Sequence, residues 1–90
     1  MVLCLLRNDG PDSRCGFVTS RRIGNAVERN RARRRLNEAV RLLWDLVEPG
    51  WDIVLIARPS VNEAEFLELQ DACARLLRRA RLLKQVDPVL

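Results

Sequence analysis

The 90-residue sequence contains no histidine and no tyrosine, and it has one lysine against fifteen arginines. Histidine is the usual general base and metal ligand at neutral pH, so its absence removes Ser-His and Cys-His nucleophile arrangements. No carboxylate cluster is evident either. The sequence therefore predicts no catalytic residue in the protein itself, and any chemistry would lie in a partner or in carboxylate-bound metal.

Cysteines and long apolar runs are also scarce. Cys4, Cys15 and Cys73 are odd in number and stand at no metal-ligand spacing, so we interpret them as reduced core thiols. No apolar run approaches the ~20 residues of a membrane span, and Met1–Leu6 is too short for the core of a signal peptide. We therefore expect a cytoplasmic protein without a membrane partner.

The remaining composition is that of one folded domain over residues 1–90. The apolar fraction of 48% is ordinary for a folded protein and does not indicate global disorder. A chain of this length buries a modest core, roughly 60–65% of its unfolded surface.

Positive charge is concentrated in one stretch. Residues 21 to 41 contain eight arginines and two acids, a local charge of +6, whereas the rest of the chain has eight basic and ten acidic residues. Such a field indicates a polyanionic partner, of which RNA and DNA are the commonest. The alternative is a solvated helix face, but acids normally interleave with the bases on such a face.

Two short strands are predicted before the basic stretch. Val2–Leu6 is an apolar run too short for a helix, and Arg14–Ser20 has the composition of a second strand. The segment between them is rich in turn-forming residues, so we expect an antiparallel hairpin. Alternation places Phe17 on one face and Gly16 on the other, where the missing side chain leaves room for close approach.

The basic stretch itself is predicted to form an amphipathic helix. Asn25 is a suitable N-cap, and the helix is expected to run to about Val47. Arginines crowded at i,i+4 spacing and near the helix start cost stability, which indicates a functional reason for them. The apolar positions recur at steps of three and four and form one stripe, namely Ala32, Leu36, Ala39, Val40, Leu43 and Val47.

A further strand and helix complete the prediction. Ile53–Ala57 is a continuous apolar run rich in β-branched residues, which favours a central strand covered on both faces. The last helix is expected to bury Phe66, Leu69, Cys73, Leu76, Leu77, Ala80 and Leu83. The basic residues at its end, Arg78 to Lys84, fit either the usual cations that complement the dipole at a helix C-terminus or an accessory RNA contact. The order β-β-α-β-α predicts an α+β fold, a two-layer α/β sandwich.

From Ser20 to Arg34 the chain reads Ser-Arg-Arg-Ile-Gly-Asn-Ala-Val-x-Arg-Asn-Arg-x-Arg-Arg, which resembles the signature of the bacterial ribonuclease P protein subunit with its RNR element. The flanks Gly16–Val18 and Asp52–Pro59 are also similar, and the resemblance extends from about Val2 to Leu83. It implies a fold of three strands, helix, strand and helix. In that fold the RNR helix joins two parallel strands by a left-handed crossover, against the right-handed rule.

The resemblance also implies a function. The protein would be the partner of a ribozyme, whose RNA subunit and mainly RNA-bound Mg²⁺ cleave precursor tRNA and release the 5′ leader. It would dock on the RNA subunit and hold the leader, with no small-molecule substrate. The residues implied for RNA binding are Arg21, Arg22, Asn25, Arg29, Asn30, Arg31, Arg33, Arg34 and Arg35. Ser20 and Phe17 are candidates for the leader cleft, although for Phe17 a place in the core is the favoured interpretation.

The chain departs from the family pattern in two places. Family members usually open with a helix that carries aromatic and basic residues, whereas this chain starts at the strands, so that helix is expected to be absent. The basic residue that often closes the motif is Asn37 here. Both departures bear on leader binding more than on docking to the RNA subunit.

Three other functions fit the sequence less well. A non-catalytic basic RNA-binding module of the ribosome-associated type would share the charge pattern. A DNA-binding helix motif would need a helix before the basic one, where the sequence predicts a strand. A self-sufficient protein nuclease is disfavoured by the missing histidine and carboxylate cluster.

Overall fold

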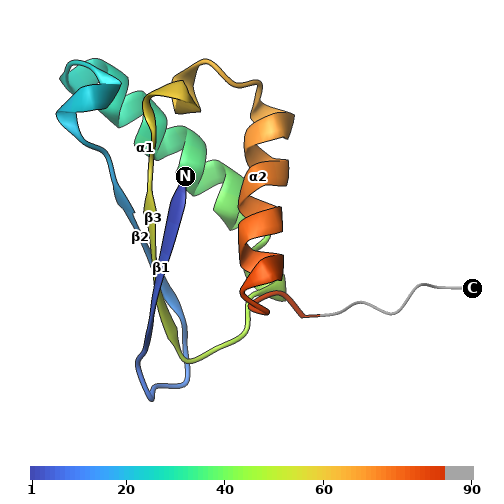
Figure 1. Cartoon of the computed structure of the whole chain (residues 1–90). Coiled ribbons are helices and arrows are strands. Elements are labelled where there is room, and N and C mark those ends of the chain that lie inside the picture. The colour runs from blue at the N-terminus through green and yellow to red at the C-terminus, as the bar shows by residue number, and fades with distance from the viewer. Residues whose placement is uncertain (85–90) are drawn as a thin grey trace, which may run out of the picture.

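The computed structural model describes residues 1–84, and Figure 1 shows its elements in the predicted order of strand, strand, helix, strand and helix. Short 3-10 turns precede and follow α1, and a third precedes α2. The α+β prediction is thus confirmed. The elements are β1 (Val2–Arg7), β2 (Arg14–Val18), η1 (Arg21–Ile23), α1 (Ala26–Arg41), η2 (Trp44–Leu46), β3 (Trp51–Ile56), η3 (Pro59–Asn62) and α2 (Phe66–Arg79).

The predicted hairpin of the first two strands is wrong, because β3 lies between them in the order β1-β3-β2. β3 pairs antiparallel with β1 and parallel with β2. The polar residues between β1 and β2 do not make a tight hairpin turn but form hydrogen bonds to the segment just before β3. Asn8 donates its backbone N–H to the carbonyl of Gly50 at 3.0 Å, and the Ser13 hydroxyl donates to the carbonyl of Glu48 at 2.6 Å.

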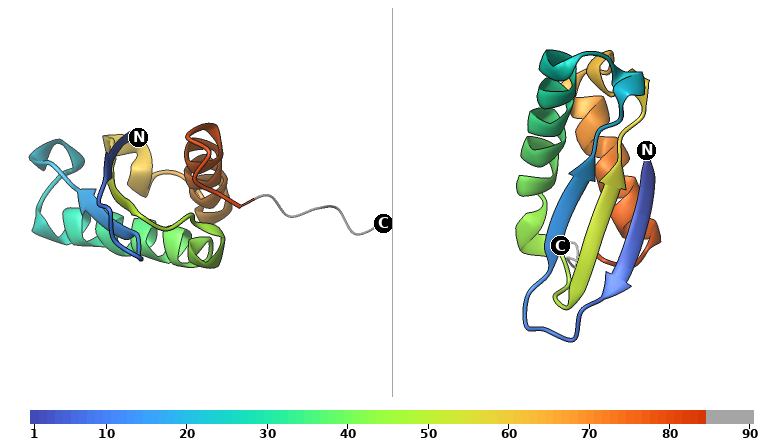
Figure 2. Two further views of the ribbon diagram at one scale, coloured as in Figure 1. Left: turned by 90° about the horizontal axis from the view of Figure 1, so that it is seen from below. Right: turned by 90° about the vertical axis from the view of Figure 1, so that its left-hand side faces the viewer.

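The connection from β2 through α1 to β3 has the unusual hand. In the right-hand view of Figure 2 α2 lies behind the sheet, α1 runs down beside β2 and shares one core with α2, and β2 stands to the left of β3 with both strands running upward. A chain that passes behind the sheet and moves to the right makes a left-handed crossover. This geometry agrees with the expectation from the family and departs from the usual right-handed rule.

Both helices cover one face of the sheet, and the core lies between the helices and the sheet (Figures 1 and 2). Leu36 of α1, Leu55 of β3 and Cys73 of α2 have no exposed surface. The opposite face of the central strand, at Val54 and Ile56, is only half-buried among the described residues. The prediction that this strand is covered on both faces is therefore wrong for that part of the chain.

The apolar stripe of α1 is confirmed, but the helix ends earlier than predicted. Regular α-helix stops at Arg41, and tighter i to i+3 hydrogen bonds follow, such as that from the N–H of Leu43 to the carbonyl of Val40 at 2.9 Å. The tightening lets Val47 reach the core in extended conformation, where it pairs with Leu83. Tertiary packing overrides the helical periodicity here.

The three cysteines are free thiols in different surroundings. Cys73 is buried and Cys15 is half-buried, which agrees with core thiols, but Cys4 is exposed and contradicts that interpretation. Burial raises the pKa of both Cys15 and Cys73 to about 11. These two side chains therefore remain neutral thiols at neutral pH and are poor nucleophiles.

Over the described residues, neither helix has the length and apolar character that a membrane crossing requires.

Candidate RNA-binding surface

A sharp turn between β2 and α1 sets the direction in which α1 starts. Gly24 has a φ of +143°, a backbone conformation that residues with a Cβ atom rarely adopt, so glycine is favoured at this turn. The Asn25 side chain then accepts the N–H of Glu28 at 2.9 Å, which confirms the predicted N-cap. Ser20 similarly accepts the N–H of Arg22 at 3.3 Å. Ser20 and Asn25 thus have structural roles whatever they contribute to RNA binding.

Replacing Asn25 separates those two roles. We expect Asn25→Ala to lower the free energy of unfolding by about 1 kcal/mol, because a cap hydrogen bond is lost. Asn25→Asp should keep the cap, since a carboxylate accepts the same bond and suits the helix N-terminus. Thermal melting of both variants checks this, and equal losses would contradict a capping role.

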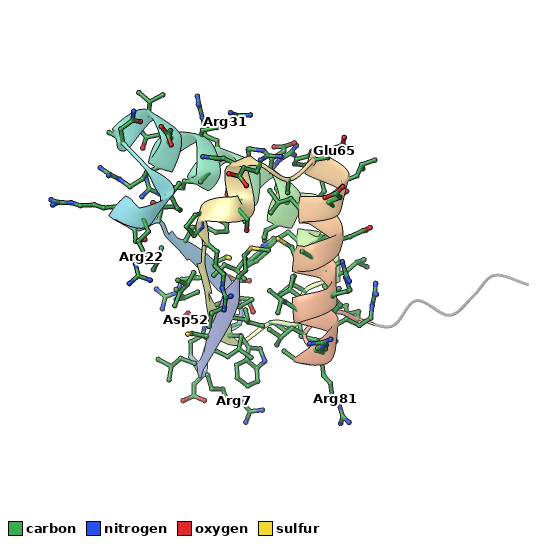
Figure 3. The ribbon with its side chains drawn as sticks, turned by 45° about the horizontal axis from the view of Figure 1, so that its top comes forward. Arg7, Arg22, Arg31, Asp52, Glu65 and Arg81 are labelled. Atoms are coloured by element: carbon green, nitrogen blue, oxygen red, sulfur yellow. The ribbon has the colours of Figure 1, made fainter. Side chains whose placement is uncertain are left out.

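The exposed side of α1 carries three arginines and an asparagine that we call the α1 cationic face, made of Asn30, Arg31, Arg33 and Arg34. All four side chains are exposed. Arg33 donates to the Thr19 hydroxyl at 2.8 Å and to the Asn30 side-chain oxygen at 3.3 Å, so its guanidinium is held beside the end of β2. In Figure 3 Arg31 points away from the body of the molecule.

An open groove of about 840 Å³ runs between the α1 cationic face and the edge strand β2. Phe17 forms part of its wall and also packs against the core, so the structure gives it both of the positions considered for it. A Cβ atom added at Gly16 would meet nothing within 4 Å, which confirms the room expected there. The lining residues are Cys15, Gly16, Phe17, Val27, Asn30, Arg33, Arg34 and Asn37.

Two of the arginines implied for RNA binding are engaged within the fold. Arg35 is half-buried and donates to the carbonyl of Val61 at 2.5 Å and to that of Ala64, so it ties α1 to the segment before α2. Arg29 is half-buried and donates to the carbonyl of Gly24 at 3.0 Å. Their RNA contacts stay predictions, and the geometry favours structural roles for both.

The ends of the two parallel strands bring a further arginine to the site. Because Val18 of β2 pairs with Ile56 of β3, the exposed residues Arg21, Arg22 and Arg58 follow the same edge of the sheet. Figure 3 shows Arg22 projecting outward from this edge. Arg58 was not among the predicted site residues, although parallel pairing of these strands was the signal that could have identified it.

The ion pairs of the described residues lie outside the α1 cationic face. The ion pairs within residues 1–84 are Arg14–Asp52 at 2.9 Å and Arg41–Glu38 at 2.6 Å. Hydrogen bonds from Arg14 and Asn8 lower the pKa of Asp52, and the hydrogen bond from Arg41 lowers that of Glu38. The α1 cationic face therefore keeps its charge unneutralised over the part of the chain that the structure describes.

The same surface does not offer a metal site. Within residues 1–84 no three Asp, Glu, His or Cys side chains gather closely enough to hold an ion. The donor groups that do gather on α1 are guanidinium N–H groups, which bind anions and not cations. Such groups suit phosphate and other anions.

The family of the chain follows from comparison with known proteins. The family model for Ribonuclease P matches residues 1–81. The chain belongs to the ribonuclease P protein family. The resemblance found in the RNR segment is thereby confirmed over nearly the whole chain.

Relatives within the ribonuclease P family are close in sequence. The ribonuclease P protein component of Roseiflexus sp. (strain RS-1) is 51% identical over 88 residues, which cover 92% of this chain and 72% of the relative. That of Chloroflexus aurantiacus (strain J-10-fl) is 58% identical over 71 residues, 78% of this chain and 53% of the relative. The chain thus spans between half and three quarters of the length of these relatives.

Solved ribonuclease P proteins share the fold. The protein from Thermotoga maritima superposes with a TM-score of 0.78 at 28% identity, covering 86% of this chain and 74% of the other. That from Staphylococcus aureus also gives 0.78, at 25% identity and with 91% and 75% covered. The two-layer arrangement is therefore that of the family.

Proposed function

We propose that this chain acts as the protein subunit of ribonuclease P. It docks on the catalytic RNA subunit with the α1 cationic face and holds the 5′ leader of precursor tRNA near the ends of β2 and β3. In this way it assists the Mg²⁺-dependent endonucleolytic removal of the leader. The observation that carries the proposal is an unneutralised arginine face beside an open groove, in a chain of this family.

Docking on RNA follows from the chemistry of the exposed side chains. A guanidinium grips a phosphate with two parallel N–H groups and stays charged at any relevant pH. The bond from Arg33 to Thr19 fixes one guanidinium in advance, which lowers the ordering cost on binding. Asn30 lies between two arginines and can add a hydrogen bond to a sugar or a base.

Leader binding is proposed for the edge where β2 and β3 end. Arg21, Arg22 and Arg58 are exposed there, and single strands bind grooves in which cations follow the backbone. Phe17, in the wall of the groove, has a half-buried aromatic ring that could stack one base.

The chain's own residues supply binding and not the bond-breaking step. The donor set fits phosphates, so we propose that Mg²⁺ is held by the RNA subunit. The arginines reduce phosphate repulsion between the RNA subunit and its substrate, which lets the complex form at a lower Mg²⁺ concentration.

Cleavage of precursor tRNA tests the proposal. Adding the protein to the ribonuclease P RNA of the same organism at low Mg²⁺ should raise the cleavage rate about tenfold or more. The added contacts stabilise the complex with the precursor, and ~1.4 kcal/mol of binding energy suffices for a tenfold gain. Gel analysis of the released leader measures it. Tight RNA binding without stimulation would instead favour the non-catalytic RNA-binding module.

A further inference from the structure

A second concentration of positive charge lies at the end of α2. Residues 72 to 84 contain five basic residues and no acid. All five side chains are exposed, and none makes an ion pair within residues 1–84. We call this the α2-end surface, and its members are Arg75, Arg78, Arg79, Arg81 and Lys84.

The α2-end surface is separate from the α1 cationic face. In Figure 3 Arg81 lies at the foot of the molecule, whereas Arg31 lies at the top. Arg75 and Arg79 line a groove of about 220 Å³ between α2 and the start of β1, together with Met1, Ala72 and Leu76. One rigid RNA segment on α1 would therefore leave the α2-end surface free.

Arg81 occupies a position that folding alone would give to glycine. It has a φ of +60°, in the left-handed region, just after the end of α2. The N–H of Leu82 bonds to the carbonyl of Leu77 at 2.9 Å and the N–H of Arg81 to that of Arg78 at 3.0 Å, the two bonds of a Schellman motif. Glycine is favoured at this position because it has no Cβ. An exposed arginine here breaks a local rule, and such conflicts tend to mark function.

An aromatic side chain extends the surface. Arg7 lies over the ring of Trp51, with its guanidinium carbon 5.3 Å from the ring centre. Trp51 packs against the buried cluster to which Leu77 and Leu82 of the Schellman motif also belong. Figure 3 shows Arg7 and Arg81 at the same end of the molecule. Arginine beside a half-buried indole is a combination that suits nucleic acid.

Completion of the helix explains only part of this charge. Cations in the last turn complement the helix dipole, which accounts for Arg78 and Arg79. Arg75 lies a turn earlier, and Arg81 and Lys84 lie beyond the helix. An anionic membrane surface is a poorer partner, because a helix lying in lipid needs a free apolar face, and that of α2 is buried in the core at Leu69 and Cys73.

We propose that the α2-end surface binds the phosphates of a second RNA segment, so that the protein contacts RNA at both ends of its body. The inference rests on the proposed ribonuclease P role. The segment belongs to the RNA subunit or to the precursor tRNA, since both present the same phosphate chemistry.

The variant Arg81→Gly should affect stability and RNA affinity in opposite directions. It should leave the melting temperature unchanged or raise it by a few degrees, since glycine suits the left-handed position. It should weaken RNA binding about three- to tenfold near 0.1 M salt and lower the salt slope by about one, as expected for one lost phosphate contact. The matched control is Arg41→Gln, which removes an arginine already paired with Glu38.

Binding is measured over a salt series in two arms, with ribonuclease P RNA alone and with that RNA plus precursor tRNA. A loss in the first arm assigns the segment to the RNA subunit, and a loss in the second arm only assigns it to the precursor. If Arg81→Gly matches Arg41→Gln in both arms while Arg31→Gln weakens binding, the inference is overturned and the proposed function stands. If the unaltered protein fails to bind either RNA, both fall.

Discussion

Replacing Leu36 with alanine should lower the free energy of unfolding by about 2–4 kcal/mol. Leu36 has no exposed surface and lies in the cluster that joins α1 to β3 and α2. Removing its side chain leaves a cavity that a two-layer protein closes poorly, because the sheet and both helices meet there. In a domain of this size the loss corresponds to a fall in melting temperature of roughly 10–25 °C.

Leu67→Ala is the matched control, because it makes the same chemical change on a side chain that is 70% exposed. Its cost should stay within about 0.5 kcal/mol. Chemical denaturation of both variants gives the two free energies of unfolding. If Leu36→Ala costs no more than Leu67→Ala, then Leu36 does not anchor α1 to the sheet, and the direction of the α1 cationic face needs another explanation.

The helices could be predicted from the sequence because their signal is local. The stripe of α1 repeats every three to four residues, and Leu36 and Ala39 both proved fully buried. Strand pairing is a non-local choice that alternation leaves open. The turn-rich segment between β1 and β2 is compatible with a hairpin and also with hydrogen bonds to the residues just before β3. The burial of β3 between the two strands decides for the second arrangement.

The candidate site could be located in the sequence as a segment but not residue by residue. Arg31 and Arg35 stand one helical turn apart and cannot be distinguished by periodicity. Yet Arg35 reaches the carbonyls of Val61 and Ala64, and Arg31 points to solvent, because η3 packs near only one of them. Arg58 reaches the site through strand register, which no local pattern records. The fold thus divides one arginine-rich segment into structural and exposed members.

Changing Arg31, Arg33 and Arg34 together to glutamine should weaken binding to the ribonuclease P RNA by about 100- to 1,000-fold near 0.1 M salt. Each arginine that neutralises a phosphate contributes a slope of about 0.9 to the dependence of log affinity on log salt. The slope should therefore fall by nearly three, and stimulation of precursor cleavage at low Mg²⁺ should be lost with it. Filter binding over a salt series measures the first effect.

Stability should move little in this triple variant, which separates lost binding from lost folding. Removing the charges relieves repulsion along α1 and an unfavourable interaction with the helix dipole, and it sacrifices the bond from Arg33 to Thr19. These terms are each below about 1 kcal/mol and oppose one another. The control is Arg14→Gln with Arg41→Gln, since both arginines are already paired with acids. An affinity of the triple variant within threefold of that control would mean that α1 contacts no phosphates, because the loss of three guanidinium groups from a phosphate interface lowers the affinity by far more than threefold.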